Sequence, residues 1–346
     1  MKVIIDSTLR EGEQTFGVVF SPGRKLEIIQ RLCAIGIEEI ELGIASRYDR
    51  IPEFLISRAR ASGVVGRLAL WCRCLKEDIV IGAAAKPDLL SLSIPVSDLH
   101  IDKKLGKSRA WIIERVEKSI HSALELGVPL VSLGLEDATR ADPEFLRKII
   151  GLARRSGAGR IRLADTVGIA GPNQTAALVR ELKGQFDIEI AVHMHNDFGM
   201  ATANSIAAMD GGADWVDTTI LGLGERAGNA RLEEVAAYLC LRRRHHYNLS
   251  EIPALSRIVA ETTGREIQPH QPIIGADIFA CETGLHLQGL ERDPATYEPF
   301  PPERVLAERV LRYGAKAGRR EIGSSLGRPD RECPDHFLCE APPPGT

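Results

Sequence analysis

The stretch IEIAVHMHNDFGMATANSIAAM, residues 188–209, contains both halves of the unit that decides the fold. Residues 188–193 are predicted to form a buried β-strand, and residues 201–209 a helix. His193 and His195 lie two residues apart at the end of this strand. Side chains alternate between the faces of a strand, so both imidazoles point the same way and can offer nitrogen ligands to one metal ion. The pair alone is weak evidence, because two histidines on one strand face are more often packing or surface residues.

The same succession of a β-rich run and an amphipathic helical stretch occurs eight times in the first two-thirds of the chain. The expected strands are 2–6, 38–42, 68–72, 89–94, 130–135, 160–164, 188–193 and 215–220. The expected helices are near 21–36, 50–61, 76–85, 108–126, 142–155, 172–184, 201–209 and 232–242. Eight consecutive strand–helix pairs over this length are typical of a (β/α)8 TIM barrel, an α/β fold. An open doubly wound sheet is the alternative, but no glycine-rich dinucleotide-binding turn follows the first strand.

The pattern changes after the eighth unit. We expect residues 1–248 to form the barrel and residues 249–323 a small helical lid or dimerisation region. Residues 324–346 end in Pro-Pro-Pro-Gly and carry Arg, Pro and Asp, which predicts a disordered tail. Within the second region, one helix is expected near 250–263 and a charged helix near 302–312.

The composition is typical of a soluble globular enzyme. The 346 residues are 44% hydrophobic and 26% charged, and 47 acidic against 44 basic residues give a net charge of −3. This balance gives no reason to expect nucleic acid or an anionic membrane as a partner. We find no signal peptide and no apolar run long enough to span a bilayer. The seven cysteines are therefore interpreted as reduced thiols of a cytoplasmic protein.

Polar or charged residues follow all eight expected strands, at the end of a TIM barrel where chemistry takes place. Loops are polar in any protein, but this does not explain why Glu41 closes an apolar strand, or why acids, histidines and an arginine recur there. Glu11, His193 and His195 would give a divalent cation three protein ligands and leave positions open for substrate oxygens. An arginine beside such a metal would neutralise a developing enolate or alkoxide.

Three motifs resemble the signatures of the homocitrate synthase and isopropylmalate synthase family. They are DSTLREGEQ at 6–14, HMHNDFG at 193–199 and GLGERAGN at 222–229, and the resemblance covers roughly residues 1–300. It implies a metal-dependent TIM-barrel acyltransferase that condenses acetyl-CoA with a 2-oxo acid. It also implies a homodimer in which the C-terminal segment reaches over the neighbouring barrel. Segments such as EDATRAD at 136–142 are most similar to the nitrogenase-associated homocitrate synthases, which implies 2-oxoglutarate as the oxo acid and a role in nitrogen fixation.

The resemblance also implies a metal site. Glu11, His193 and His195 would hold a divalent cation such as Mg²⁺, Mn²⁺ or Zn²⁺. Asn229 would be a further ligand or lie directly behind one. Arg10 would lie beside the bound oxo acid and polarise its ketone.

Further residues at the barrel mouth are implied to bind substrate. Glu41 would orient Arg10 or a metal-bound water, or else is a buried ion-pair partner. Thr166 would bond the oxo acid carboxylate, and Gln14 is another substrate-binding candidate. Arg73 is the candidate for the distal carboxylate of 2-oxoglutarate, because a guanidinium can bond a carboxylate twice. The alternative for Arg73 is a surface arginine at the barrel rim.

Ser97 and Glu136 complete the substrate-binding candidates. Glu136 and Arg140 can equally form a structural pair. His286 matches the catalytic histidine of the family's C-terminal segment, and a histidine suits proton transfer near neutral pH. Tyr297 lies where the family carries a tyrosine that assists it.

Two departures from the family pattern fall in the expected lid. Relatives often carry a histidine at the position of Cys281, and GAKAG at 314–318 stands in place of Gly-Lys-His-Ser-Gly. Both bear on acyl-CoA handling, the lid and the dimer more than on the barrel. Another oxo acid therefore stays an alternative, as in 2-phosphonomethylmalate, isopropylmalate or citramalate synthases. A related lyase that runs the aldol step in reverse and a non-catalytic barrel that serves as a binding subunit are further alternatives.

Overall fold

The computed structural model describes residues 3–48, 51–313 and 316. Within them, eight parallel strands close into a barrel in the order β1 to β8, with a helix after each strand. Strand β1 closes the barrel, because it pairs with β2 on one side and with β8 on the other. The predicted (β/α)8 barrel is confirmed.

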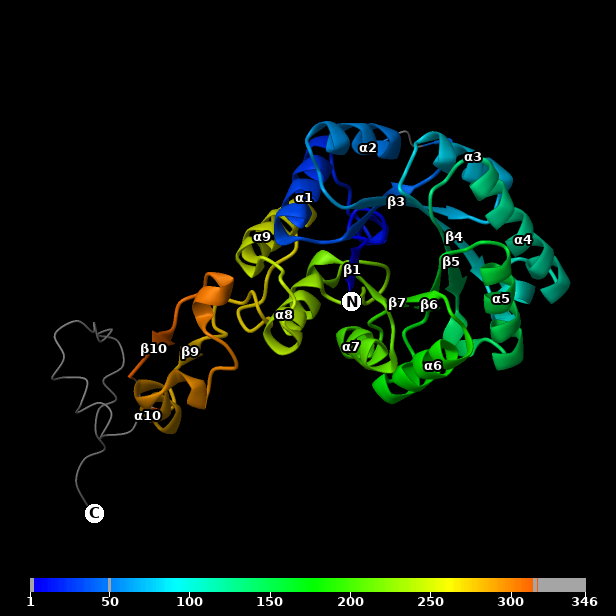
Figure 1. Cartoon of the computed structure of the whole chain (residues 1–346). Coiled ribbons are helices and arrows are strands. Elements are labelled where there is room, and N and C mark those ends of the chain that lie inside the picture. Colours follow the sequence, from blue (N-terminus) through cyan, green and yellow to red (C-terminus); the bar gives the residue numbers. More distant parts are fainter. Residues whose placement is uncertain (1–2, 49–50, 314–315, 317–346) are drawn as a thin grey trace, which may run out of the picture. The chain divides into compact units, whose positions relative to one another are not determined.

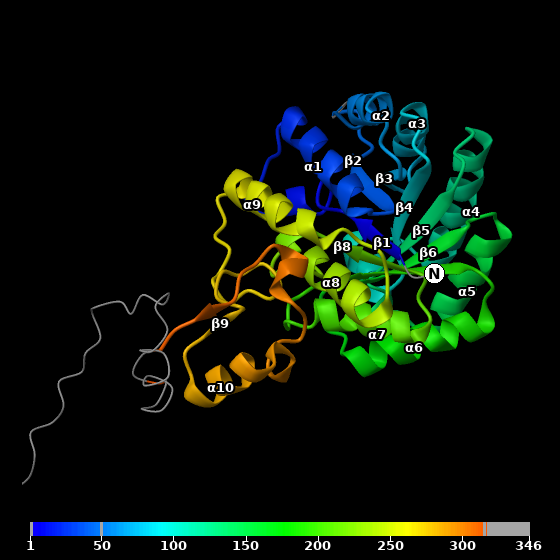
Figure 2. The same cartoon turned by 60° about the vertical axis from the view of Figure 1, so that its left-hand side comes forward.

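All eight predicted strands overlap the observed ones, although the last ends before residue 220. The strands are β1 (Val3–Asp6), β2 (Glu39–Ile44), β3 (Arg67–Arg73), β4 (Leu89–Pro95), β5 (Val131–Glu136), β6 (Arg160–Asp165), β7 (Glu189–Met194) and β8 (Trp215–Thr218). The helices are α1 (Pro22–Ile35), α2 (Ile51–Ala61), α3 (Lys76–Ala84), α4 (Arg109–Glu125), α5 (Pro143–Arg155), α6 (Pro172–Gln185), α7 (Ala201–Gly211) and α8 (Leu232–Arg243). Figures 1 and 2 show these helices arranged around the strands.

The sequence sets the limits of α1 as predicted. The Ser21 hydroxyl accepts a hydrogen bond from the Arg24 amide at 3.2 Å, and Pro22 occupies the first turn. Gly36 ends the helix with a φ of 97°, in the left-handed region that glycine adopts without strain. Such ends let each helix return the chain to the amino end of the next strand.

The interior of the barrel contains paired charges. Arg160 on β6 is fully buried and donates to both oxygens of Glu39 on β2, at 2.6 and 3.0 Å. Nearer the carboxyl ends of the strands, Arg162 donates to Glu41 at 3.0 Å and to Asp217 at 2.9 Å. Each guanidinium has a carboxylate partner, because a buried charge that loses its partner destabilises a protein by about 3–5 kcal/mol. Glu41 and Asp217 also contact residues of the site described below.

The described chain divides into two compact units, one ending at Arg265 and one beginning at Glu266. The helix predicted near 250–263 is confirmed as α9 (Ile252–Thr263), which lies in the first unit and packs against α1. The predicted domain boundary after residue 248 stays a prediction.

The prediction of a charged helix at 302–312 is wrong. A single 3-10 turn, Pro302–Val305, ends at Leu306, whose left-handed φ of 54° stops the helix. Arg309 then donates to Glu298 at 2.5 and 2.7 Å, and the following residues form a strand in place of a further helical turn. The remaining elements of this unit are a parallel pair of β9 (Ala280–Cys281) and β10 (Val310–Leu311), the helix α10 (Gly284–Arg292) and a 3-10 turn at Pro294–Thr296.

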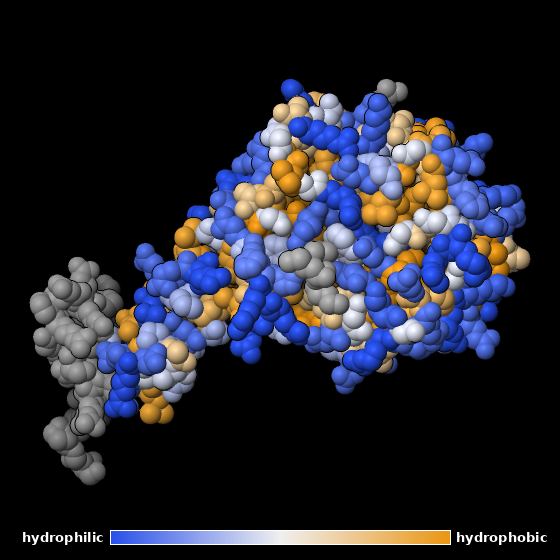
Figure 3. Space-filling view, viewed as in Figure 1, coloured by the Kyte–Doolittle hydropathy of each residue, from blue (hydrophilic) through white to orange (hydrophobic). Residues whose placement is uncertain are grey.

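No described helix has both the length and the apolar character needed to cross a bilayer. On the face shown in Figure 3, hydrophilic side chains cover much of the outer surface of the barrel helices and hydrophobic ones show between them. The predicted tail, 324–346, lies outside the described residues, as does the segment 314–318 apart from Lys316.

Candidate active site

His193 lies at the end of β7 and His195 directly follows the strand, and their side chains lie together, as the strand alternation predicts. Both side chains are buried, and their ring centroids are 4.9 Å apart with nearly perpendicular planes. One oxygen of Glu11 lies 3.9 Å from Nε2 of His193, and the other lies 3.9 Å from Nε2 of His195. These separations are too long for hydrogen bonds, so the three side chains face one another without forming hydrogen bonds between the glutamate and the two histidines.

A tight turn after β1 brings Glu11 to this place. The Ser7 carbonyl oxygen accepts hydrogen bonds from the amides of Arg10 and Glu11, at 3.0 and 2.7 Å. Burial opposes ionisation of Glu11, but the adjacent Arg10 guanidinium and the two imidazoles hold the pKa of its carboxyl below the usual value. Glu11 is therefore a carboxylate at neutral pH.

Asp217 on β8 orients His193. Its Oδ2 atom lies 2.9 Å from Nδ1 of His193, and its other oxygen accepts the Ser7 hydroxyl. Complete burial opposes ionisation, yet His193, Arg162 and Arg10 hold the pKa of Asp217 well below its usual value. An ionised carboxylate only accepts hydrogen bonds, so Nδ1 of His193 carries a proton toward Asp217, and Nε2 is the ring atom that faces Glu11.

His195 is kept neutral by its surroundings. Burial and the neighbouring His193 lower its pKa to about 3, so the imidazole is uncharged at physiological pH. Its Nδ1 atom is buried and has no hydrogen-bond partner among the described residues. A neutral ring is the form that binds metal ions.

Asn229 pairs with His195 in an isolated antiparallel β-bridge. Its Nδ2 donates to the Leu223 carbonyl oxygen at 2.9 Å, which leaves Oδ1 buried and without a partner in the described part of the chain. A Cβ atom at Gly224 would lie 2.0 Å from Nδ2 of Asn229, so only glycine permits this approach. A buried amide oxygen without a partner is costly unless something else binds it.

The donor set fits a divalent cation. Each of Glu11, His193 and His195 offers one ligand atom within 4.8 Å of the others, and they are the only such group among the described residues. One carboxylate and two imidazoles suit first-row divalent ions and leave coordination positions open for other ligands. The structure therefore brings together three of the four predicted ligands, Glu11, His193 and His195, and the metal itself belongs to the proposal below.

Arg10 is fixed beside this group by carboxylates. Its Nε donates to Glu41 at 2.6 Å, its Nη1 bonds Glu11, and its Nη2 lies 3.9 Å from Asp217. Its guanidinium also lies over the Trp71 ring, 5.8 Å from the centroid. The structure thus gives Glu41 both of the contacts considered from the sequence, since it orients Arg10 and is a buried ion-pair partner.

Three other predicted substrate-binding residues follow β1, β6 and β4, and they are Gln14, Thr166 and Ser97. With its amide oriented to donate, Gln14 bonds both oxygens of Glu11, at 2.9 and 3.2 Å. The Thr166 hydroxyl accepts the Asp137 amide at 2.8 Å. The Ser97 hydroxyl is buried and donates to the Asp137 carboxylate, so Ser97 supports the loop that follows β5.

The structure does not pair Glu136 with Arg140, so that alternative is wrong. Glu136 accepts the Ser93 hydroxyl at 2.9 Å and the Lys104 ammonium at 2.7 Å. Arg140 instead bonds both oxygens of Asp137, at 2.8 Å each. Asp137 has a left-handed backbone with a φ of 59°, which turns its carboxylate toward Arg140.

Arg73 lies at the end of β3 with a side chain that is 63% exposed. It bonds both oxygens of Asp78, at 2.7 and 3.1 Å. A guanidinium has five N–H donors, so this pair fixes the direction of Arg73 without using all of them.

Comparison with known proteins settles the family. A model of the HMGL-like family matches residues 2–259 of the chain. The chain belongs to the HMGL-like family. It is 40% identical over 319 residues to 2-isopropylmalate synthase 2 of Caldanaerobacter subterraneus, covering 91% of this chain and 82% of that protein. It is 41% identical over 331 residues to a homocitrate synthase of Frankia alni, covering 93% and 92%.

A solved HMG-CoA lyase of Bacillus subtilis shares the fold of this HMGL-like chain. The TM-score is 0.66 over 77% of this chain and 95% of that one, at 19% identity, which supports the fold alone. The sequence relatives include an isopropylmalate synthase and a homocitrate synthase, so the predicted family is confirmed and the chain is an enzyme, not a non-catalytic barrel. Because these two relatives differ in name, they do not decide which oxo acid this enzyme uses.

In the second unit of this HMGL-like enzyme, His286 and Tyr297 lie together. Their ring centroids are 4.1 Å apart, and both side chains are exposed. A Cβ atom at Gly289 would lie 2.4 Å from Cε2 of Tyr297 and 2.9 Å from Oγ1 of Thr296. Gly289 therefore leaves the space in which the tyrosine ring reaches His286.

The family resemblance implies that His286 transfers a proton with Tyr297 beside it, and on that role Gly289→Ala is expected to lower kcat by about 10- to 100-fold, because displacing a reacting group by about 1 Å can cost that much. The added methyl group pushes the Tyr297 ring away from His286. Steady-state kinetics would measure the loss, with Gln288→Ala in the same helix as the control. An unchanged kcat in Gly289→Ala would show that the ring contact has no part in the reaction.

Sequence reasoning missed two buried residues of this site, Asp217 and Arg162. Each is a charged residue inside a β-rich run, the signal that had singled out Glu41. Arg162 on β6 bonds Glu41 on β2 and Asp217 on β8, neither of which is a neighbouring strand, so these two contacts follow only from closure of the sheet.

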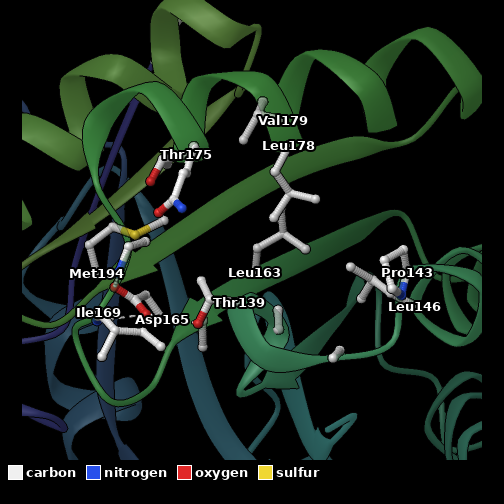
Figure 4. Close-up of a pocket in the computed structure, with 15 residues that line it drawn as sticks. Thr139, Pro143, Leu146, Leu163, Asp165, Ile169, Thr175, Leu178, Val179 and Met194 are labelled. Carbon is white, nitrogen blue, oxygen red and sulfur yellow. Dashed lines mark hydrogen bonds between the residues drawn. The ribbon is translucent and has the colours of Figure 1, made fainter.

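A cavity of about 340 Å³ lies elsewhere, between β6, α5 and α6 (Figure 4). Its labelled lining is mostly apolar, with Leu146, Leu163 and Val179 among the side chains, and Asp165 at one end. The Asp165 carboxylate is already bonded by Thr139 and by two backbone amides. None of the metal-ligand candidates lines this cavity, so it is separate from the site.

Proposed function

We propose that the chain is a homocitrate synthase, which condenses acetyl-CoA with 2-oxoglutarate and hydrolyses the thioester to release homocitrate and CoA. The observation that carries the proposal is the convergence of Glu11, His193 and His195 beside Arg10 at the carboxyl end of the barrel. Similarity to a homocitrate synthase over most of both chains supports it. We also propose that the protein is cytoplasmic and forms a homodimer.

A divalent cation, Mg²⁺, Mn²⁺ or Zn²⁺, held by Glu11, His193 and His195 with Asn229 nearby, would supply a Lewis acid that makes the ketone electrophilic. Arg10 would add a fixed positive charge where the alkoxide develops. Glu41 holds the Arg10 guanidinium in place before the reaction, at 2.6 Å.

The remaining steps would use Thr166, His286 and Tyr297. The Thr166 hydroxyl would donate to the oxo acid carboxylate. His286 would take a proton from the acetyl methyl group, with Tyr297 against its ring. The resulting enolate carbon would attack the ketone carbon of the oxo acid, and water would then cleave the thioester and release CoA.

Arg73→Ala is expected to raise the KM for 2-oxoglutarate at least about tenfold, since a hydrogen bond to a charged group contributes about 1.5–3 kcal/mol. The pair with Asp78 holds the guanidinium in one direction, from which it would bind the distal carboxylate. Arg47→Ala is the matched control, because Arg47 is 60% exposed and pairs with Glu77. An unchanged KM in Arg73→Ala would reject this role and leave Arg73 a rim arginine.

The deciding experiment is release of free thiol from acetyl-CoA with a panel of oxo acids. The panel contains 2-oxoglutarate, 2-oxoisovalerate, pyruvate and phosphonopyruvate. We expect the highest kcat/KM with 2-oxoglutarate. Turnover of another acid without 2-oxoglutarate would reject homocitrate synthesis and keep the condensing mechanism. Cleavage of homocitrate without condensation would indicate a lyase.

A further inference from the structure

Arg226 joins the loops that follow three strands of the barrel. It lies after β8, and its guanidinium bonds both oxygens of Asp197, after β7, at 2.8 and 3.0 Å. The same guanidinium donates to the backbone carbonyl oxygen of Thr166, after β6, at 2.7 Å. Asp197 is two residues from His195, so these contacts connect the metal side of the site with Thr166.

The backbone of Arg226 lies in the left-handed region, with a φ of 57°. This conformation is uncommon for residues other than glycine, and it persists where the surrounding structure fixes it, often at functional sites. The side chain is 42% exposed, and an exposed ion pair contributes little to the stability of a fold. The contacts of Arg226 are therefore better explained by the positions in which they hold Asp197 and Thr166 than by a contribution to stability.

Thr166 is fixed from two directions. Its hydroxyl oxygen accepts the Asp137 amide at 2.8 Å, and its carbonyl oxygen accepts Arg226. A hydroxyl that already accepts a bond from the protein keeps its own proton to donate. That proton suits a carboxylate oxygen.

We propose that Arg226 is a positioning residue, which holds the Thr166 loop against the loop after His195 so that the Thr166 hydroxyl meets the carboxylate of the oxo acid. This proposal rests on the proposed function. Arg226 acts through Thr166 and Asp197 and does not itself bind substrate.

The test compares Arg226→Ala, Asp197→Asn and the double variant in the full-length protein. We expect Arg226→Ala to raise the KM for the oxo acid and lower kcat, reducing kcat/KM about 10- to 100-fold. The KM for acetyl-CoA stays unchanged. The double variant loses no more than Arg226→Ala alone, because both changes remove one set of contacts. Arg226→Lys restores little, since an ammonium cannot bond a carboxylate twice and a carbonyl as well.

Arg109→Ala is the matched control. Arg109 is also 42% exposed and bonds both oxygens of Asp98, elsewhere on the barrel unit. Its removal should leave the kinetics unchanged. Two results overturn the proposal: additive losses in the double variant, or a raised KM for acetyl-CoA with an unchanged KM for the oxo acid, which would mean that Arg226 binds acyl-CoA directly.

Amide hydrogen exchange separates this proposal from the proposed function. If no oxo acid is turned over, the proposed function fails, but positioning remains measurable. Arg226→Ala should speed exchange about tenfold at the Asp137 amide, which bonds Thr166, and at the Asn196 amide, which bonds the Gly228 carbonyl. Unchanged exchange at both amides overturns the positioning role.

Discussion

His193→Ala is expected to weaken divalent-metal binding more than about 100-fold and to abolish thiol release with every oxo acid. The loss of partners behind metal ligands alone costs about 10- to 100-fold, and His193 supplies a ligand atom itself. Its Nδ1 is engaged by Asp217, and its Nε2 lies 3.9 Å from Glu11. After the substitution, His195 and Glu11 are left with too few protein ligands to hold the ion in place.

Metal content of the purified protein and titration calorimetry would measure the effect on binding. His121→Ala, an exposed position on α4, is the control. Added metal should raise the unfolding temperature of the natural protein and of the control, but not of His193→Ala, because a ligand stabilises only a form that binds it. Chelation should remove the activity of the natural protein, and a divalent ion should restore it. A full equivalent of metal in His193→Ala would contradict the assigned site.

The barrel could be predicted because its signal is local and repeated. Each strand–helix pair is read within about 30 residues, as in the segment 188–209, and eight pairs leave few alternatives to closure. The ligand set followed from the same rule, because Glu11 and the two histidines stand at strand ends that meet at one face. The ligand atoms of these three side chains lie within 4.8 Å of one another, and their binding of a metal ion stays a prediction.

Side-chain partners could not be predicted in the same way. In the EDATR segment, Arg140 is close enough in sequence to pair with either Glu136 or Asp137. Because these two acidic side chains point in different directions, the sequence did not show that Arg140 bonds Asp137. Arg73 stands at the predicted strand end, yet its pair with Asp78 depends on where α3 begins. The left-handed backbone of Leu306, which ends the helix predicted at 302–312, has no signal in a leucine.

Asp217→Asn is expected to lower the free energy of unfolding by about 3–5 kcal/mol, because it removes one partner from buried charges. Asp217 is fully buried and accepts bonds from Ser7, Arg162 and His193. The asparagine amide has the same shape as the carboxylate, but its N–H groups would face some of the groups that donate to Asp217. Denaturant unfolding would measure the loss, and Asp210→Asn, whose pair with Arg243 is exposed, should change the free energy by no more than about 1 kcal/mol.

The same substitution should weaken metal binding by about 10- to 100-fold in the folded protein, because the Asp217 carboxylate fixes which nitrogen of His193 carries the proton. Ser7→Ala separates this effect from stability, since it removes one hydrogen bond from Asp217 and keeps the charge. We expect Ser7→Ala to lose about 1 kcal/mol of stability and to keep its metal affinity. If folded Asp217→Asn binds metal as the natural protein does, then Asp217 serves only as a counter-charge for Arg162, and His193 is oriented by the packing around its ring.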